Sequence, residues 1–499
     1  MRWFSIATST LALALALCAG TRDTQAGGAG GIGVPSGLVS AAEGQSQEAA
    51  LVIADATFDP KTRRLTVYGA NFGTRRLPTV RLGSEYLVLR SATDDQLVTD
   101  PVPLEVGPGE HTLIVMAGND RSRFDVASIL VADPGTAGNG PLEAADRNRI
   151  VVLDRGGDVG WDTSIALNAQ GLPLVSYLDY TNRDLKLARC ADAHCRMSSL
   201  VAVDTEGDVG WSSSLALGAD GLAVMSYYDG GNRALKFARC SDPRCETFEV
   251  RVLDGAGEVG QHSSLAIGRD GLPVISYYDK DRGDLKVAHC RDPGCSDVSI
   301  ATVDRAGDVG WYTAVAIGSD GNPIISYFDT SRRDLKVAHC ENIACTMARV
   351  SVVDTGGVGL GTDILVPENG LPLVVYWDFF NDDLKMARCL NPECSRADLK
   401  VIDPEGSVGS NAAMALGADG NPVISYHDHS NANLRVAHCG DPGCDRVRIQ
   451  TPDSAGSVGW HTDVGVGADG MPIVSYYEET NGDLKFLRCG DRVCGGAPE

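Results

Sequence analysis

The chain has 499 residues, with 66 Asp and Glu against 43 Lys and Arg, and a formal net charge of -23. A chain of this length exceeds one ordinary hydrophobic core, so we expect several domains or an array of repeats. The acidic residues are spread along the chain, and such a surface repels nucleic acids and anionic membranes, so we expect neither as a partner.

The first segment, 1–26, is predicted to be a secretory signal. It reads "MRWFSIATSTLALALALCAGTRDTQA", with one early arginine, an apolar run and a possible cleavage region ending near Ala26. Cys18 raises lipid anchoring as an alternative, although Leu17 stands where a lipoprotein cleavage site has a small residue. No later segment is apolar for long enough to span a bilayer. We therefore expect a secreted, periplasmic or cell-surface protein, in a compartment where disulfides persist.

The next region is a linker followed by a small domain. Residues 27–49 are rich in Gly, Ser and Ala, which is typical of a flexible linker. Residues 50–134 alternate short apolar runs with turn signals, and this pattern predicts a small β-sandwich. The order of "YGANFG", "VRLG", "QLV", "GPGEHTLIV" and "FDV" resembles the TIG/IPT immunoglobulin-like domain. The resemblance implies a module that spaces or presents other domains. A second linker, 135–148, follows.

Seven repeats occupy 149–495, and their cysteine pairs recur every 50 residues, with one step of 49. The third unit contains four β-rich runs, Ser264–Gly268, Pro273–Tyr278, Leu285–Cys290 and Val298–Val303, separated by turn residues. Four strands on such a period are typical of one propeller blade. The last unit lacks a fourth strand, and "RIVVLD" before the first unit can supply it. The predicted fold class is all-β: an immunoglobulin-like sandwich plus a seven-bladed propeller closed by its N-terminal strand.

The cysteine pairs are predicted to be structural disulfides, because each pair brackets the turn between a third and a fourth strand. Metal binding is the rival, since His289, His339 and His438 directly precede a cysteine; other units carry arginine there, which is a permanent cation, so we expect no metal at these positions. The predicted pairs are Cys190 and Cys195, Cys240 and Cys245, Cys290 and Cys295, Cys340 and Cys345, Cys389 and Cys394, Cys439 and Cys444, and Cys489 and Cys494.

Some positions repeat in every unit and are explained by the blade itself. An aspartate such as Asp154 ends each fourth strand, with a glycine three residues later, and we expect it to hold a turn. A tyrosine such as Tyr177 recurs in each second strand, and we expect it to pack with its phenol group reaching loop backbone.

Candidate ligand contacts lie on the face formed by the loops from fourth to first and from second to third strands. There the units differ, and the first four form an acidic sector with tryptophans. An alternative is that Trp wedges between blades while Asp holds the loop or pairs with lysines such as Lys186. The candidates are Trp161, Trp211, Trp311, Trp460, Asp158, Asp208, Glu258, Asp308, Asp179, Asp229, Asp279 and Asp329.

The sequence favours a binding or scaffold protein that recognises carbohydrate or another extracellular macromolecule, a glycan or a protein. A sugar ring would stack on Trp while carboxylates bind its hydroxyls. The repeats also resemble secreted sialidase-like propellers, which implies a glycan-processing hydrolase as an alternative, but "DRGGDVGW" departs from that family's Ser-x-Asp-x-Gly-x-Thr-Trp pattern. A purely structural envelope protein is a third possibility. We expect no cofactor, with calcium as an option, for example at "YHDHSNAN".

Overall fold

The computed structural model describes residues 52–59, 63–70, 72, 77–82, 85–93, 95–103, 109–116, 124–131 and 147–496. The predicted signal peptide (1–26), the first linker (27–49) and most of the second linker (135–148) lie outside these residues. All regular elements in the described part are β-strands. No helix there has the length and apolar character that crossing a bilayer requires.

The first domain is a β-sandwich of two four-stranded sheets, in the orders β1-β2-β6-β5 and β4-β3-β7-β8. Leu65, Val67, Val80, Leu97 and Leu113 are fully buried in its core. Their alternation with partly buried positions matches the period of two that a half-buried strand requires. The strands are β1 (Val52–Asp59), β2 (Arg64–Ala70), β3 (Thr79–Leu82), β4 (Glu85–Leu87), β5 (Leu89–Ala92), β6 (Gln96–Thr99), β7 (Gly109–Met116) and β8 (Phe124–Val131).

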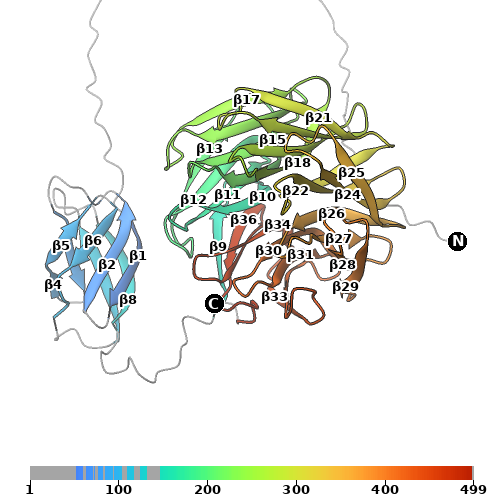
Figure 1. The fold of residues 1–499 in the computed structure, drawn as a ribbon. Coiled ribbons are helices and arrows are strands. Elements are labelled where there is room, and N and C mark those ends of the chain that lie inside the picture. Colours follow the sequence, from blue (N-terminus) through green and yellow to red (C-terminus); the bar gives the residue numbers. More distant parts are fainter. Residues whose placement is uncertain are drawn as a thin grey trace, which may run out of the picture. The chain divides into compact units, whose positions relative to one another are not determined.

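Seven four-stranded antiparallel sheets form the propeller, as the repeat pattern predicts (Figure 1). The predicted closure is confirmed, because β9 (Arg149–Asp154) pairs with β36 (Asp483–Arg488) and completes blade 7. Since the two ends of the repeat array share one sheet, no blade is left with three strands.

The strands of the blades follow one another from the axis outward. Blade 1 is β10 (Val159–Leu167), β11 (Pro173–Asp179), β12 (Asp184–Cys190) and β13 (Ser198–Asp204); blade 2 is β14 (Val209–Leu217), β15 (Ala223–Asp229), β16 (Ala234–Cys240) and β17 (Phe248–Asp254); blade 3 is β18 (Val259–Ile267), β19 (Pro273–Asp279), β20 (Asp284–Cys290) and β21 (Val298–Asp304); blade 4 is β22 (Val309–Ile317), β23 (Pro323–Asp329), β24 (Asp334–Cys340) and β25 (Ala348–Asp354).

The later blades repeat this order. Blade 5 is β26 (Val358–Leu365), β27 (Leu373–Asp378), β28 (Asp383–Cys389) and β29 (Ala397–Asp403); blade 6 is β30 (Val408–Leu416), β31 (Pro422–Asp428), β32 (Asn433–Cys439) and β33 (Val447–Asp453); blade 7 is β34 (Val458–Val466), β35 (Pro472–Glu478), β36 and β9.

The core between blades comes mainly from the second and third strands. In the cluster between blades 2 and 3, Val224, Leu235, Phe237, Ile275 and Tyr277 are all buried. The second strands are buried along their whole length, which explains their continuous apolar runs.

Candidate functional site

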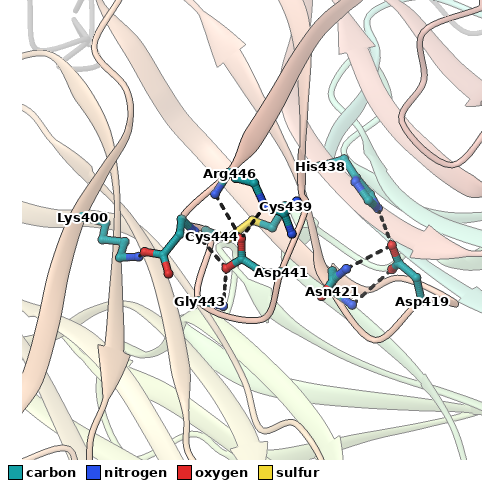
Figure 2. Close-up of a disulfide and its surroundings, with 10 residues drawn as sticks. Lys400, Asp419, Asn421, His438, Cys439, Asp441, Gly443, Cys444 and Arg446 are labelled. Atoms are coloured by element: carbon teal, nitrogen blue, oxygen red, sulfur yellow. Dashed lines mark hydrogen bonds and ion pairs between the residues drawn. A yellow bond between two sulfur atoms is a disulfide. The ribbon is translucent and has the colours of Figure 1, made fainter.

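The cysteine pairs form seven disulfides within single hairpins, as predicted, with Cα atoms 4.7 to 4.9 Å apart. Figure 2 shows the pair Cys439 and Cys444, where Asp441 accepts hydrogen bonds from the backbone amides of Gly443 and Arg446 inside the loop. An aspartate that accepts backbone amides two or more residues ahead stabilises a tight turn. The hairpin is therefore held by a covalent bond and by a carboxylate.

The histidines that precede cysteines pair with carboxylates of the turn between first and second strands. His289 lies 2.9 Å from Asp270, and His438 lies 3.1 Å from Asp419 (Figure 2). Arg239 pairs with Asp220 in the same way. Histidine and arginine thus contact the same turn carboxylate in these blades. Among the described residues, no group of three or more His, Cys, Asp or Glu side chains is arranged to hold a metal ion.

A buried triad of Asp, Tyr and Lys joins the strands of every blade, with arginine replacing lysine in blade 6. In blade 1, Tyr177 donates its hydroxyl to Asp154 at 2.7 Å, and Lys186 contacts the same carboxylate at 2.6 Å. The expectation that these phenols reach loop backbone is therefore wrong, because the aspartate that ends the neighbouring fourth strand lies closer. The other oxygen of Asp154 accepts the amide of Gly156, which confirms its turn-holding role.

The triad sets the charge state of its members. Burial by itself would raise the pKa of Asp154, but the hydrogen bonds from Lys186, Tyr177 and the Gly156 amide bring it below its usual value. Burial and the charge of Asp154 raise the pKa of Tyr177. The triad is ionic and architectural, and it recurs too regularly to mark one site.

The predicted acidic sector has its carboxylates occupied by tryptophans and their neighbours. Asp158 accepts the indole N–H of Trp161 at 2.8 Å and the hydroxyl of Tyr477 at 2.7 Å. Asp208 accepts from Trp211 and pairs with Arg183. Two more members follow the same pattern: Glu258 accepts from Gln261 and pairs with Lys280, and Asp308 accepts from Tyr278. The role of these four carboxylates as ligand contacts stays a prediction. In the structure, they hold the tryptophan, tyrosine and glutamine side chains of the same loop face in place.

Four of the predicted aspartates, at the ends of second strands, are enclosed by their own loops. Asp179 accepts two hydrogen bonds from Asn182 and lies 3.4 Å from Lys186. Its exposure is 1%, and that of Asp229, Asp279 and Asp329 is 0%. These side chains close the loop between the second and third strands, and they do not line the cavity described next.

The side chains that differ between blades meet at the propeller axis. Three residues into each first strand, the backbone adopts positive φ, from 46° at Asp162 to 57° at Gly361, and the strand register shifts at the same point. This bulge recurs in every blade and places the residue at this position beside the propeller axis, with a glycine in blade 5 and a side chain in the other six. These residues form the axial ring: Asp162, Ser212, His262, Tyr312, Gly361, Asn411 and His461.

The residue after each axial position carries a hydroxyl group in six of the seven blades, and this hydroxyl links the blade to its neighbour. Ser213 donates to the carbonyl of Asp162 at 2.8 Å and lies 3.0 Å from the Ser176 hydroxyl. The same bond runs from Thr163 to the carbonyl of His461, across the junction of blades 1 and 7. These residues form the hydroxyl ring: Thr163, Ser213, Ser263, Thr313, Thr362, Ala412 and Thr462.

Together the axial ring and the hydroxyl ring line one cavity of about 200 Å³, the axial cavity. Two of the four predicted tryptophans contact the axial ring: Trp161 lies 4.9 Å from His461, and Trp311 lies 5.3 Å from His262, between ring centroids. Trp211 packs on Tyr180, and Trp460 stacks on His427. Sequence reasoning missed the axial ring, whose signal is that the residue after the tryptophan position has six different identities in seven units.

Burial and the hydrogen bonds of Asp162 control the charge of the axial cavity. Burial lowers the pKa of His262 to about 4, so this imidazole is neutral at pH 7. Burial would raise the pKa of Asp162, but the hydrogen bond from His461, with that from the amide of Ser212, brings it below its usual value. Asp162 is thus the one ionised carboxylate in the lining.

Beneath the hydroxyl ring, polar side chains accept an amide from the next blade. Ser164 accepts the Leu215 amide at 3.1 Å, and Ser214 accepts the Leu265 amide at 3.0 Å. Blade 6 has Ala413 here, and blade 7 compensates with an aspartate, Asp463. One oxygen of Asp463 accepts the Ile165 amide and the other accepts its neighbouring Val464 amide, both at 2.8 Å. Blades 4 and 5 repeat this arrangement: blade 4 has Ala314, and Asp363 of blade 5 accepts its neighbouring Ile364 amide and the Met414 amide of the next blade.

We expect the double variant Ala413→Ser, Asp463→Ser to be more stable than the natural protein at pH 8. Burial raises the pKa of Asp463 to about 6. A carboxyl group whose pKa is raised in the folded state stabilises the fold below its unfolded-state pKa of about 4. This contribution, up to about 3 kcal/mol of unfolding free energy, is lost as pH rises to about 6. Thermal unfolding at pH 4.5 and pH 8 measures the difference, which should appear at pH 8.

Asp463→Ser alone is the matched control, because it leaves the Val464 amide without an acceptor and should lower stability by about 1–3 kcal/mol at pH 4.5. If Ala413→Ser gives no recovery in that background, the compensation between the two blades is contradicted.

The fold and the axial cavity define the protein as a disulfide-clasped seven-bladed β-propeller with an N-terminal β-sandwich. No protein-family model matches the chain, and no curated protein matches it. An auxiliary nutrient binding protein from Bacteroides ovatus is similar in structure, with a TM-score of 0.41, 13% identity, and coverage of 88% of this chain and 98% of that one. The polysaccharide lyase Uly1 is similar with a TM-score of 0.43 and 11% identity, over 72% of this chain and 95% of that one. The α-L-arabinofuranosidase Arb93A from Fusarium graminearum is similar with a TM-score of 0.40 and 12% identity, over 68% of this chain and 96% of that one.

Proposed function

We propose that the protein is an exported binding protein that takes a carbohydrate at the axial cavity. One observation carries this proposal: the positions that break the sevenfold symmetry converge on one cavity, while the repeated positions build the blades around it. A site for one specific ligand needs such asymmetry, because identical blades would present the same group seven times.

The chemistry of the lining supports a neutral, hydroxyl-rich ligand. Hydroxyl, amide and imidazole groups offer both donors and acceptors, and neither Lys nor Arg lines the cavity. Trp161 and Trp311 provide aromatic surface beside it. Its volume of about 200 Å³ is smaller than the roughly 300–1,000 Å³ of pockets for drug-sized ligands, so it fits a single sugar ring.

The remaining parts of the chain fit an exported protein. We infer a signal peptide at 1–26, linkers at 27–49 and 135–148, a TIG/IPT-like sandwich at 50–134 that presents the propeller, and a propeller domain at 149–495. Seven disulfides support secretion, a periplasmic location or the cell surface. The alternative ligand is an extracellular protein, bound at the propeller face formed by the loops from fourth to first and from second to third strands.

We expect Trp161→Ala to weaken glycan binding by about tenfold or more, because a loss of about 1.4 kcal/mol of stacking is a factor of ten in Kd. The experiment uses residues 27–499 with disulfides intact, screened on a glycan array with and without calcium, followed by titration of the best glycan. Trp211→Ala is the matched control, since its indole packs on Tyr180 and not on the axial ring. Equal losses in both variants would place the site elsewhere on the face, and silence across the array would contradict a carbohydrate ligand.

A further inference from the structure

Two side chains of the axial cavity form an ordered pair across the junction of blades 1 and 7. The Nδ1 atom of His461 lies 2.8 Å from an oxygen of Asp162, and the second oxygen accepts the amide of Ser212 at 2.7 Å. With both oxygens engaged, the carboxylate is fixed in orientation. Because Nδ1 of His461 faces the carboxylate, Nδ1 is the donor to it, and Nε2 is the ring nitrogen that can accept a proton.

The pair is accessible from the cavity, because the side chains of His461 and Asp162 remain 20% and 24% exposed. The ring of Trp161 lies beside His461 and limits its movement. An imidazole that is oriented by a carboxylate and open to a cavity is the usual arrangement of a general base.

Other cavity residues supply hydrogen-bond donors. The rings of His262 and Tyr312 lie 4.5 Å apart. Burial, together with the charge of Asp162, raises the pKa of Tyr312, so its phenol stays protonated and remains a donor. Blades 3 and 4 therefore contribute neutral groups, while blades 7 and 1 contribute the base and its carboxylate.

The composition of the lining limits the reaction class. Cleavage of a glycosidic bond uses two carboxyl groups as acid and base or nucleophile, and this cavity has one, which is already paired. Neither Lys nor Arg lines it to neutralise a uronate or a phosphate. Hydrolysis of a neutral ester requires a base for water and a donor for the developing oxyanion, and both are present.

We propose that the axial cavity hydrolyses an O-acyl ester carried by a carbohydrate, with His461 as catalytic base and Asp162 as the positioning residue. This inference rests on the proposed function, because the bound carbohydrate brings the ester to the cavity. The Nε2 atom of His461 takes a proton from water as the water oxygen bonds to the acyl carbon, and the carbonyl electron pair moves to oxygen.

Collapse of this intermediate restores the carbonyl and breaks the bond between the acyl carbon and the sugar oxygen. The departing sugar oxygen takes the proton from the imidazolium of His461, so ester and water become acid and alcohol. Tyr312 is the available donor to the oxyanion.

The test measures acetate release from O-acetylated oligosaccharides by proton NMR, with residues 27–499. His461→Asn should slow release by about 10²- to 10⁴-fold. Asparagine is chosen because Asn411 holds the same left-handed backbone in blade 6, at φ 52° against 48° at His461. Asp162→Asn should lower the rate and move the low-pH midpoint of activity to lower pH, which a merely structural role would not do. His289→Gln, on a cysteine hairpin strand, is the control and should keep the natural rate.

Measuring the binding of each variant to the same oligosaccharide distinguishes failure of the esterase proposal from failure of the proposed carbohydrate binding. Saturable binding without acetate release by the natural protein overturns the esterase proposal and leaves carbohydrate binding intact. An unchanged rate in His461→Asn also overturns it. Absence of both binding and release contradicts both proposals.

Discussion

Replacing Asp254 with alanine is expected to lower the free energy of unfolding by about 3–5 kcal/mol, because it leaves a buried charge without its partner. Asp254 is 5% exposed and accepts the hydroxyl of Tyr277 at 2.8 Å and the ammonium group of Lys286. The lysine is also buried, and its next carboxylate, Asp279, is 3.7 Å away and engaged with Arg282. Chemical denaturation with urea measures the change.

The same triad should make stability fall in acid. Burial would raise the pKa of Asp254, but Lys286, Tyr277 and the Ala256 amide lower it. A carboxylate with a lowered pKa stabilises the fold above its unfolded value of about 4, and the contribution is lost as pH falls toward the folded value. The natural protein should therefore approach Asp254→Ala in stability as pH falls below 4.

Asp297→Ala is the matched control for Asp254→Ala. Asp297 also pairs with a cation, Arg291, but the two side chains are 62% and 58% exposed, so the expected loss is below about 1 kcal/mol. A loss from Asp254→Ala as small as that of the control would contradict the structural role of the triad. The double variant Asp254→Leu, Lys286→Met should recover most of the stability that Asp254→Ala loses, because no unpaired charge remains.

Gly260→Ala is expected to destabilise the propeller by about 3 kcal/mol or more, for two additive reasons. Gly260 has φ of +102°, a region that L side chains rarely adopt, and an added Cβ would lie 2.6 Å from the Leu235 Cα on the preceding blade. Left-handed backbone costs about 1–2 kcal/mol, and crowding in a packed core adds about 1–3 kcal/mol. The melting temperature measures the combined effect.

Gly420→Ala isolates the first of these reasons. Gly420 has φ of +76°, but nothing lies within 4 Å of an added Cβ, so only the backbone term of about 1–2 kcal/mol remains. The two variants should differ clearly in melting temperature. If they melt together, close approach between blades 2 and 3 is not what requires glycine at Gly260.

The acidic sector shows the limit of reasoning from side-chain type. Asp158 and Trp161 stand three residues apart and were predicted to share a ligand, but the structure shows them hydrogen-bonded to each other. A sequence indicates which groups can bond; it does not say which partners are nearest. By contrast, Asp179 and Lys186 were weighed as a pair, and the structure places them 3.4 Å apart on the adjacent strands β11 and β12.

The sequence by itself determined the number of blades, the hairpin disulfides and the strand that closes the ring. Each of these follows from the repeat pattern: Cys290 and Cys295 bracket one turn of the unit, and the strand at Arg149–Asp154 has one sheet edge left to fill. Only the tertiary structure decided the candidate site. Asp162 and His461 belong to the first and last blades, and they meet because closing the ring brings β10 beside β34 and because a bulge in each strand turns one side chain toward the axis. Sequence periodicity reveals which positions vary, whereas their convergence depends on the closed geometry of all seven blades.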